Sequence, residues 1–515
     1  ASIFAGLLAA RTSAQIGRDL RGKVFHQVVS FSDGEMDRFS TASLITRSTN
    51  DIQQIQMVSV MLLRMVMYAP IVGIGGVIKV MNTRTGMGWI IAVAVLAIML
   101  LVMTLMSIAM PKFKIMQTLV DKLNLVSREI LTGIPVIRAF SRESFEEERF
   151  DKANKELMGT QLFTNRVMTF MMPVMMMIMN GVTVLIVWFG AKGVDMGNLQ
   201  VGDMLAFITY TMQIVMAFLM ITMVSVMLPR AGVAADRIEE VIRTQETILD
   251  PGKPADDSRE NWRGEVAFED VSFRYPGADE DAICHISFRA KPGQTTAIIG
   301  STGCGKSIVL NLIPRFYDVT SGRVTMDGVD IRQMSQRKLR SLIGYVPQKG
   351  VLFSGTIASN IGFAGNVSRE QVQEAAGIAQ AQEFILAKEE QYDSAISQGG
   401  TNVSGGQKQR ISIARAIAKS PKVYLFDDSF SALDYKTDVA LRKALGEKTK
   451  EASVIIVAQR ISTILHADQI IVLEEGAVAG IGTHKELMEK CETYQEIATS
   501  QLSEEELVSQ GGAGQ

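Results

Sequence analysis

The stretch Gly300-Ser301-Thr302-Gly303-Cys304-Gly305-Lys306-Ser307 decides the fold of the second half of this 515-residue chain. An apolar run with strand character, Thr296–Ile299, precedes it, and an apolar helical run, Ile308–Ile313, follows it. A glycine-rich turn between a strand and a helix is the context of a phosphate-binding loop, because glycine lets backbone N–H groups wrap the phosphates. The stretch predicts a nucleotide site in which Lys306 reaches the β- and γ-phosphates and the Ser307 hydroxyl ligates Mg²⁺.

A second apolar strand, Val423–Asp427, ends in a carboxylate. A buried strand that delivers a carboxylate beside a phosphate loop is the second part of a P-loop ATPase. Asp427 is therefore predicted to hold Mg²⁺, directly or through a water molecule. Many strands end in aspartate, so this prediction depends on the phosphate loop that precedes it in the sequence.

The stretch Val403–Gln407, with the sequence Val-Ser-Gly-Gly-Gln, lies between these two motifs. Here the chain resembles the ATPase domain of ABC transporters, whose signature loop normally begins with Leu. The serine and the two glycines open a helix, so their N–H groups form an anion site. The resemblance implies that this loop binds the γ-phosphate of an ATP molecule held by the partner domain, through Ser404, Gly405, Gly406 and Gln407.

Other short motifs match the same family. Tyr275, in Phe-Arg-Tyr-Pro-Gly, corresponds to the aromatic residue that stacks on adenine. Gln348, in Tyr-Val-Pro-Gln, corresponds to the loop that senses the γ-phosphate and touches the membrane domain, and Ser431–Asp434 to the loop after the Mg²⁺ strand. The resemblance implies ATP and Mg²⁺ as cofactors. The implied Mg²⁺ ligands are Ser307, Gln348 and Asp427.

Two positions depart from the pattern of a hydrolytic ATP site. The family usually has Glu, the general base, where this chain has Asp428, and His where it has Gln459. The aspartate side chain is one methylene shorter, so its carboxylate sits about 1.5 Å back from the attacking water, and a misplacement on the order of 1 Å can cost ~10²-fold in rate. Gln can donate a hydrogen bond but cannot carry a charge. The residues implied in catalysis are Asp428, Gln459, Gln348 and Ser404.

The joint departure resembles the degenerate-site subunit of bacterial heterodimeric multidrug exporters. Both changes fall in one ATP site, and both weaken hydrolysis rather than binding, since Lys306, Ser307 and Asp427 are intact. The resemblance implies that this half binds ATP with low turnover. It also implies that the chain lends its signature loop to an active site in a second ABC half, a different chain.

The first half of the chain contains apolar runs long enough to cross a bilayer as helices, which takes ~20 residues. Three runs are uncharged, a fourth carries Arg64 and Lys79 toward its ends, and the stretch before Arg11 is predicted to end a fifth span. The runs are Thr85–Pro111, Val167–Ala191, Met204–Pro229 and Met57–Met81. Their connections differ in basic content. Those over 11–56 and 112–166 are long and rich in Lys and Arg, so they are predicted to be cytosolic and the short ones to face outward.

The predicted fold class is an all-α polytopic membrane domain followed by an α/β P-loop ABC ATPase domain. The membrane half resembles the six-helix exporter type, with the first helix and most of the second missing from this sequence. The predicted boundaries are a transmembrane domain over 1–246, a linker over 247–261, an ATP-binding domain over 262–503 and a polar tail over 504–515. Glu35–Ser43 and Ser127–Arg142 sit where the family places the coupling helices that dock onto the ATPase domains.

The predicted function is ATP-driven export of amphipathic or apolar compounds across a bacterial plasma membrane, with the ATP-binding domain in the cytosol. A net charge of −2 gives no reason to expect nucleic acid as a partner. The membrane spans exclude the soluble ABC ATPases of DNA repair and translation. Export of a lipid or a peptide, and a regulatory ABC protein that does not transport, remain alternatives.

A methionine-rich face on the last two spans is a candidate binding surface for substrate, although lipid contact or helix packing is the more common role of such a stripe. Its members in the last span fall at helical spacing, and seven more Met lie between residues 168 and 179. Those of the last span are Met212, Met216, Met220, Met223 and Met227.

Overall fold

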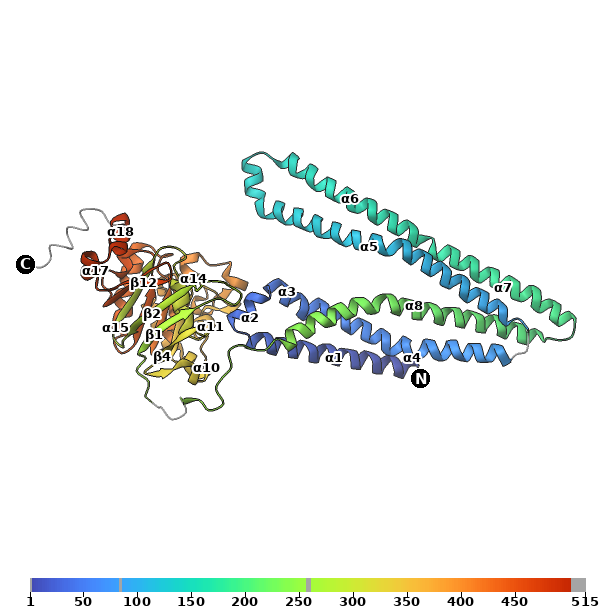
Figure 1. The fold of residues 1–515 in the computed structure, drawn as a ribbon, viewed down its shortest axis with the longest axis horizontal. Coiled ribbons are helices and arrows are strands. Elements are labelled where there is room, and N and C mark those ends of the chain that lie inside the picture. Colours follow the sequence, from blue (N-terminus) through green and yellow to red (C-terminus); the bar gives the residue numbers. More distant parts are fainter. Residues whose placement is uncertain (1, 83–85, 256–260, 502–515) are drawn as a thin grey trace, which may run out of the picture. The chain divides into compact units, whose positions relative to one another are not determined.

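The computed structural model describes residues 2–82, 86–255 and 261–501 (Figure 1). The chain forms two compact units, and each is described by itself. The first unit contains residues 1–26 and 42–243, and the second contains residues 27–41 together with 244–515. The predicted polar tail, 504–515, lies outside the described residues, as do residues 256–260 of the predicted linker.

The first unit is built from long helices. The described part of the chain holds four helical segments that are long and apolar enough to cross a membrane. Their apolar windows lie within residues 41–82, 88–139, 143–195 and 201–221. The helices are α1 (Ser2–Ser30), α3 (Thr41–Thr46), a π-helical turn (Arg47–Asp51), α4 (Ile52–Asn82), α5 (Gly88–Ala139), α6 (Glu143–Thr169), α7 (Met171–Asp195) and α8 (Val201–Arg243).

The helices run far beyond their apolar windows. Helix α5 has 52 residues, with Pro111 and Pro135 inside it. At 1.5 Å per residue it is about 78 Å long, well over twice the ~30 Å thickness of a bilayer core. The predicted span that ended at Pro111 therefore continues through the proline. The predicted span Val167–Ala191 lies within the helical segment 143–195, in which α6 and α7 are separated only by Phe170, whose backbone is itself helical (φ −66°, ψ −21°).

Close packing within this unit joins α4 to α8, which lie side by side in Figure 1. Small residues permit the approach: a Cβ added at Gly76 would lie 2.7 Å from Ile214, and one at Gly73 would lie 3.5 Å from Ala217. Buried Phe207 and Ile90 belong to a neighbouring cluster that links α8 to α5 and α7. Close contact through small residues is how membrane helices associate where no hydrophobic driving force acts between them.

The second unit is organised by a six-stranded sheet with the order β12-β11-β3-β10-β9-β6. All neighbouring pairs in it are parallel except β11 with β12. A four-stranded antiparallel sheet, with the order β2-β1-β4-β5, packs against it, and a short pair β7-β8 completes the strands. The strands are β1 (Val266–Phe273), β2 (Ile283–Ala290), β3 (Thr295–Gly300), β4 (Ser321–Met326), β5 (Val329–Asp330), β6 (Ile343–Val346), β7 (Gly355–Thr356), β8 (Ala395–Ile396), β9 (Val423–Asp427), β10 (Ser453–Val457), β11 (Gln469–Glu474) and β12 (Ala477–Gly482).

Both faces of the six-stranded sheet are covered. Along β9, Tyr424 and Phe426 point into one core, and Val423 and Leu425 into the other, because side chains alternate between the faces of a strand. The helices are α9 (Lys306–Leu312), α10 (Gln336–Ser341), α11 (Ile357–Ile361), α12 (Arg369–Ile378), α13 (Gln382–Leu386), α14 (Gly405–Ala418), α15 (Tyr435–Lys448), α16 (Ile461–Ile464), α17 (His484–Lys490) and α18 (Glu492–Gln501). The result is the α/β ATPase architecture that the phosphate loop predicted.

A short helix from the first part of the sequence packs with this ATPase unit. Helix α2 (Asp33–Arg38) begins two residues before the predicted coupling segment Glu35–Ser43 and overlaps its first half. Its Glu35, 5% exposed, accepts hydrogen bonds from the backbone N–H and the hydroxyl of Thr247, at 3.1 and 2.6 Å. The start of the predicted linker therefore serves as an anchor for α2.

Candidate functional site

The predicted site residues come from the carboxyl ends of four adjacent parallel strands, β3, β10, β9 and β6. Gly300 ends β3 and Asp427 ends β9, while Gln459 and Gln348 each follow the last residue of β10 and β6 by two positions. Ligands of open parallel sheets bind outside this edge. The fold therefore gathers residues that are more than 150 positions apart in the sequence, from Gly300 to Gln459, at one place.

The phosphate loop connects β3 to α9 through residues 300–305. The Lys306 ammonium lies across it and donates to the carbonyl oxygens of Gly300, at 2.8 Å, and Ser301, at 2.6 Å. Gly305 precedes α9 with φ +94°, and a Cβ added there would lie 2.4 Å from the Ile283 Cγ2 atom. Glycine is thus required at this position both by the backbone and by the space available.

Within the same loop, Cys304 is only 4% exposed, and its Sγ lies 3.7 Å from Lys306 Nζ. Ser301, Thr302 and Gly303 complete the loop between the two ends, and all three are exposed. The loop thus presents backbone and small polar groups on its outer side and buries its thiol.

The predicted Mg²⁺ ligands Ser307 and Asp427 are in contact, with the serine Oγ donating to Asp427 Oδ1 at 3.0 Å. Burial raises the pKa of Asp427, the charge of Asp428 adds to this, and the Ser307 hydrogen bond and Lys306 act against it. A hydroxyl and a carboxylate are hard oxygen ligands of the kind that Mg²⁺ prefers, and a cation here would favour the ionised form of Asp427. These residues therefore fit Mg²⁺. The Gln348 amide oxygen could serve as a further ligand, since its nitrogen is directed to Asp428.

Asp428 lies next to the Mg²⁺ aspartate in a left-handed conformation, φ +44°, and is 8% exposed. Its Oδ2 accepts two hydrogen bonds, from Gln459 Nε2 at 2.9 Å and from Gln348 Nε2 at 3.2 Å. Its backbone N–H donates to Val457 O, which ties it to β10. The two residues that depart from the hydrolytic pattern are thus bonded to each other, a relationship that sequence spacing could not reveal.

The signature loop begins α14 and is built as a capping box. Ser404 Oγ accepts from the Gln407 N–H at 3.3 Å, and Gln407 Oε1 accepts from the Ser404 N–H at 3.1 Å. Ser404 and Gly405 are exposed, and Gly406 is half-buried. Val403, where the family usually has Leu, is 9% exposed and belongs to the core. The exposed helix terminus is positioned to bind an anion, because its first N–H groups are free of helical partners.

Tyr275 follows β1 and packs against two other rings. Its ring centroid lies 5.0 Å from that of Phe273 and 5.6 Å from that of Tyr317, both in edge-to-face geometry. The Tyr275 side chain remains 37% exposed, as a stacking platform for a base requires. It lies two residues beyond β1, in the connection between β1 and β2 of the four-stranded sheet.

Sequence reasoning missed two polar contacts of this region. Gln409, 2% exposed, donates to Pro347 O at 3.2 Å and accepts from Gly350 N at 3.0 Å, so it joins α14 to the Gln348 loop. Tyr317 donates to Asp37 of α2 at 2.9 Å. Only the position of Gln409 two residues after Gln407 could have suggested its role, and no local pattern marks Tyr317.

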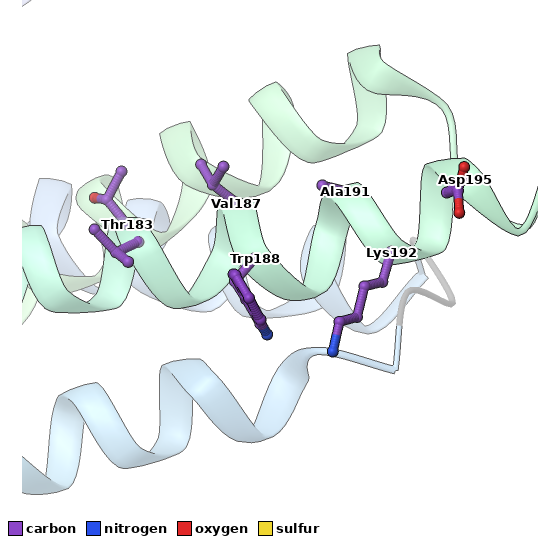
Figure 2. A pocket seen from close by; sticks show the side chains of 7 residues that line it. Thr183, Val187, Trp188, Ala191, Lys192 and Asp195 are labelled. Carbon is purple, nitrogen blue, oxygen red and sulfur yellow. The ribbon is translucent and has the colours of Figure 1, made fainter.

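In the membrane unit, a hollow of about 560 Å³ lies on the surface of α7. Figure 2 shows the side chains that line it. Lys192 Nζ lies 5.0 Å from the Trp188 ring centroid, and Asp195 ends the helix. Trp and Lys near a helix end are typical of the membrane–water interface. Because all lining residues come from one helix, the hollow is a surface groove. They are Thr183, Val184, Val187, Trp188, Ala191, Lys192 and Asp195.

Comparison with known proteins covers both units. Residues 1–218 match the family model described as the ABC transporter transmembrane region, and residues 283–431 match the model described as ABC transporter. An uncharacterized ABC transporter ATP-binding protein of Mycobacterium bovis is 41% identical over 504 residues, which cover 97% of this chain and 86% of the relative. A Bacillus subtilis protein with the same description, YfiB, is 38% identical over 509 residues, covering 98% and 88%.

A solved structure of a bacterial Atm1-family ABC exporter with ATP bound has a similar fold. The TM-score is 0.79 at 28% identity, over 96% of this chain and 86% of that one. The family models, the relatives and the solved structure agree on a transmembrane region followed by an ABC ATPase domain. The chain therefore belongs to the ABC exporters, in which a helical transmembrane region is fused to an ABC ATPase domain.

Proposed function

We propose that this chain is one half of an asymmetric exporter, which moves amphipathic or apolar compounds out of the cytosol with a different ABC half as its partner. Membership of the family makes it an ATP-driven membrane exporter. The proposal adds the asymmetry of its two ATP sites, the class of substrate and its place in the cell membrane with the ATPase unit in the cytosol.

The observation that carries the proposal is the bonding of Asp428. A general base must reach its water molecule at about 2.6–3.2 Å. The Asp428 carboxylate is short, and one of its oxygens already accepts from Gln348 and Gln459. It is therefore held toward the two amides, and neither amide can take a positive charge near the γ-phosphate. This supports a site that binds ATP and turns it over slowly.

The binding of ATP does not depend on Asp428 or on the two glutamines that bond to it. Lys306, Ser307 and Asp427 are all in place, and the ion that Ser307 and Asp427 fit would neutralise charge on the β- and γ-phosphates. Lys306 is placed to orient the phosphates, and the Ser307 hydroxyl holds the Asp427 carboxylate by a hydrogen bond. Residual hydrolysis at this site is expected to be low because the base is misplaced, and not because ATP fails to bind.

The signature loop supports the second part of the proposal. Its capping box is complete and its helix terminus is exposed, so it can serve an ATP molecule held by another domain. Donors aimed at the γ-phosphate are the groups that electrostatic catalysis uses. A partner with Glu and His at the positions of Asp428 and Gln459 would then carry the productive site.

The exposed methionines support an apolar or amphipathic substrate. Met212, Met216 and Met223 of α8 are exposed, while Met220 and Met227 of the same stripe are half-buried. Ile214 and Val215 on the same helix are buried, so three of the five methionines lie off the packed side of α8. Flexible thioethers suit surfaces that bind varied apolar compounds.

A flux assay tests the proposed function directly. Inside-out vesicles containing this chain and its partner are expected to accumulate a fluorescent amphipathic cation when ATP is added. Accumulation of the cation should stop when Lys306→Ala is introduced into this chain. Accumulation of a labelled lipid or peptide in place of the dye would show the alternative export functions. ATP hydrolysis without accumulation of any of the three would indicate a regulatory protein.

A further inference from the structure

Helix α2 reaches the aromatic cluster that carries Tyr275. Tyr317 Oη donates to Asp37 Oδ2 of α2 at 2.9 Å, and the Tyr317 ring lies edge-to-face on the Tyr275 ring at 5.6 Å. Phe273 closes the cluster, with centroids 5.2 Å from Tyr317 and 5.0 Å from Tyr275. One tyrosine side chain therefore touches both the predicted adenine platform and the helix in the predicted coupling segment.

A second contact brings α2 to the same place. A Cβ built on Gly34 would lie 4.0 Å from Pro276 Cγ, and Pro276 directly follows Tyr275. Burial raises the pKa of Tyr275, and the charges of Asp37 and Asp33 on α2 raise it further. The helix thus approaches the surroundings of Tyr275 at two points, Tyr317 and Pro276.

The helix has an attachment to the linker that does not involve Tyr317, because Glu35 accepts from the N–H and the hydroxyl of Thr247. Contacts within residues 27–41 keep the helix folded, and in one of them Glu35 accepts from the N–H and the hydroxyl of Ser32, at 2.7 and 2.5 Å. Phe39, which follows α2, is 4% exposed and stacks on Phe31 with centroids 5.9 Å apart. Loss of the Tyr317 hydroxyl should therefore leave α2 folded and in place.

We infer that Tyr317 is a positioning residue, through which Asp37 of α2 holds Tyr275 in the orientation that binds the adenine ring. The inference rests on the proposed role of Tyr275 as the adenine platform and extends it. A hydrogen bond to a carboxylate is stronger than one between neutral groups, so Asp37 fixes the Tyr317 ring more firmly than packing alone. Because Tyr275 packs on the Tyr317 edge, its freedom falls when Tyr317 is fixed.

The consequence is a reciprocal coupling between base binding and α2. If α2 improves the binding of ATP through Tyr317, bound ATP must improve the docking of α2 by the same factor. The phosphates do not take part, because Tyr275 is expected to meet only the base. The affinity for a ligand that has phosphates and no base should therefore not change when Asp37 or Tyr317 is substituted.

The experiment uses the full-length transporter assembled with its partner. Photolabelling on ice with 8-azido-ATP, resolved by gel, reports occupancy of this chain separately from that of the partner. Displacement of the label is measured with Mg-ATP and, in parallel, with magnesium tripolyphosphate, which has no base. The variants are Tyr317→Phe, Asp37→Ala and the two combined.

Each single variant is expected to raise the ATP concentration for half displacement about fivefold, with tripolyphosphate unchanged, since coupling between sites is typically about 5-fold or more. The double variant should be no worse than either single one, because both changes break one hydrogen bond. Tyr392→Phe is the matched control: within the described residues its buried hydroxyl has no hydrogen-bond partner, so ATP displacement should not change.

Two results would overturn the inference: ATP displacement within twofold of the parent chain in both single variants, or an equal loss for ATP and tripolyphosphate. Tyr275→Ala separates this failure from that of the platform. If Tyr275→Ala weakens the binding of ATP but not that of tripolyphosphate, and Tyr317→Phe weakens neither, Tyr275 binds the base without the help of α2. If Tyr275→Ala also leaves ATP unaffected, the adenine platform lies elsewhere and the inference falls with it.

Discussion

The Gln459 amide nitrogen donates to Asp428 Oδ2 across 2.9 Å, so the two residues that depart from the family pattern act on each other. Gln348 donates to the same oxygen at 3.2 Å. Residues in direct contact do not have additive effects when they are changed. The two departures are therefore best treated as one arrangement, and the predictions about hydrolysis depend on it.

Changes at the two ATP sites should have unequal effects. In the complex with the partner, Asp428→Asn is expected to change steady-state phosphate release less than about twofold, because a misplaced base has little to lose. Ser404→Arg should nearly abolish release, since donors aimed at the γ-phosphate are worth about 2.7–4 kcal/mol each in comparable sites. Expression and dimer formation are checked for both variants. If Asp428→Asn lowers phosphate release as far as Ser404→Arg does, both sites are hydrolytic and the asymmetric proposal is wrong.

Restoring both departures together should activate the site of this chain. In the Ser404→Arg background, which silences the partner's site, residual phosphate release reports this site alone. Asp428→Glu with Gln459→His is expected to raise it by on the order of tenfold or more, because the longer carboxylate recovers a misplacement of about 1 Å. Each single change should give less than half of the combined gain in free energy, since the residues are coupled. Independent, additive gains would show that their contact has no catalytic meaning.

The Glu35 anchor of α2 should be sensitive to acid. Burial acts to raise the pKa of Glu35, but hydrogen bonds from Ser32 and Thr247 outweigh it and lower the pKa below its ordinary value. A carboxylate with a lowered pKa stabilises the folded state above the ordinary Glu value of about 4.3, and this stabilisation is lost as the pH falls through the lowered pKa.

Glu35→Gln is therefore expected to lower the free energy of unfolding by about 1.5–3 kcal/mol at pH 7, the usual range for a hydrogen bond to a charged group. The difference in the free energy of unfolding between the parent chain and the variant should shrink below pH 4. Thermal unfolding across this pH range measures it, and Glu280→Gln, an exposed carboxylate between β1 and β2, is the control. A gap that persists unchanged at low pH would mean that the ionised carboxylate is not the stabilising form.

Gly305→Ala should disable the phosphate loop. The new Cβ would lie 2.4 Å from Ile283 Cγ2, and φ of +94° is strained for alanine. Binding of a fluorescent ATP analogue to this chain should fall at least tenfold. Gly446→Ala, on the exposed face of α15, has nothing within 4 Å of the added Cβ and should be neutral or stabilise by up to about 1 kcal/mol. Equal ATP binding by both variants would contradict the requirement for glycine at position 305.

The phosphate loop, the Mg²⁺ aspartate and the family were predictable because each depends on a local pattern with a fixed neighbour. Thr296–Ile299 and Ile308–Ile313 marked the strand and helix on either side of the loop, and the structure has β3 and α9 there. The apolar spans were also visible, since membrane helices need long uncharged runs. Their ends were not, because Pro111, where a predicted span ended, lies inside the continuous helix α5.

Contacts between distant residues could not be predicted in the same way. The hydrogen bond from Gln459 to Asp428 depends on β10 and β9 being neighbours in the sheet, and sequence order does not state strand order. The contact of Tyr317 with Asp37 joins residues 280 positions apart. The family resemblance placed a coupling helix at Glu35–Ser43, but nothing in the sequence indicated which residues of the ATPase unit would contact it.

The packing of residues 27–41 with the ATPase unit makes that unit discontinuous in the sequence. A recombinant fragment that starts at the linker would lack Glu35 and Asp37, so Thr247 and Tyr317 would lose the carboxylates they bond to. Such a fragment should gain stability when a synthetic peptide spanning residues 27–41 is added in trans. The soluble piece of this exporter that crystallographers and screeners would make by a single cut is therefore incomplete, and a fusion of the two segments through a short flexible tether is the better reagent.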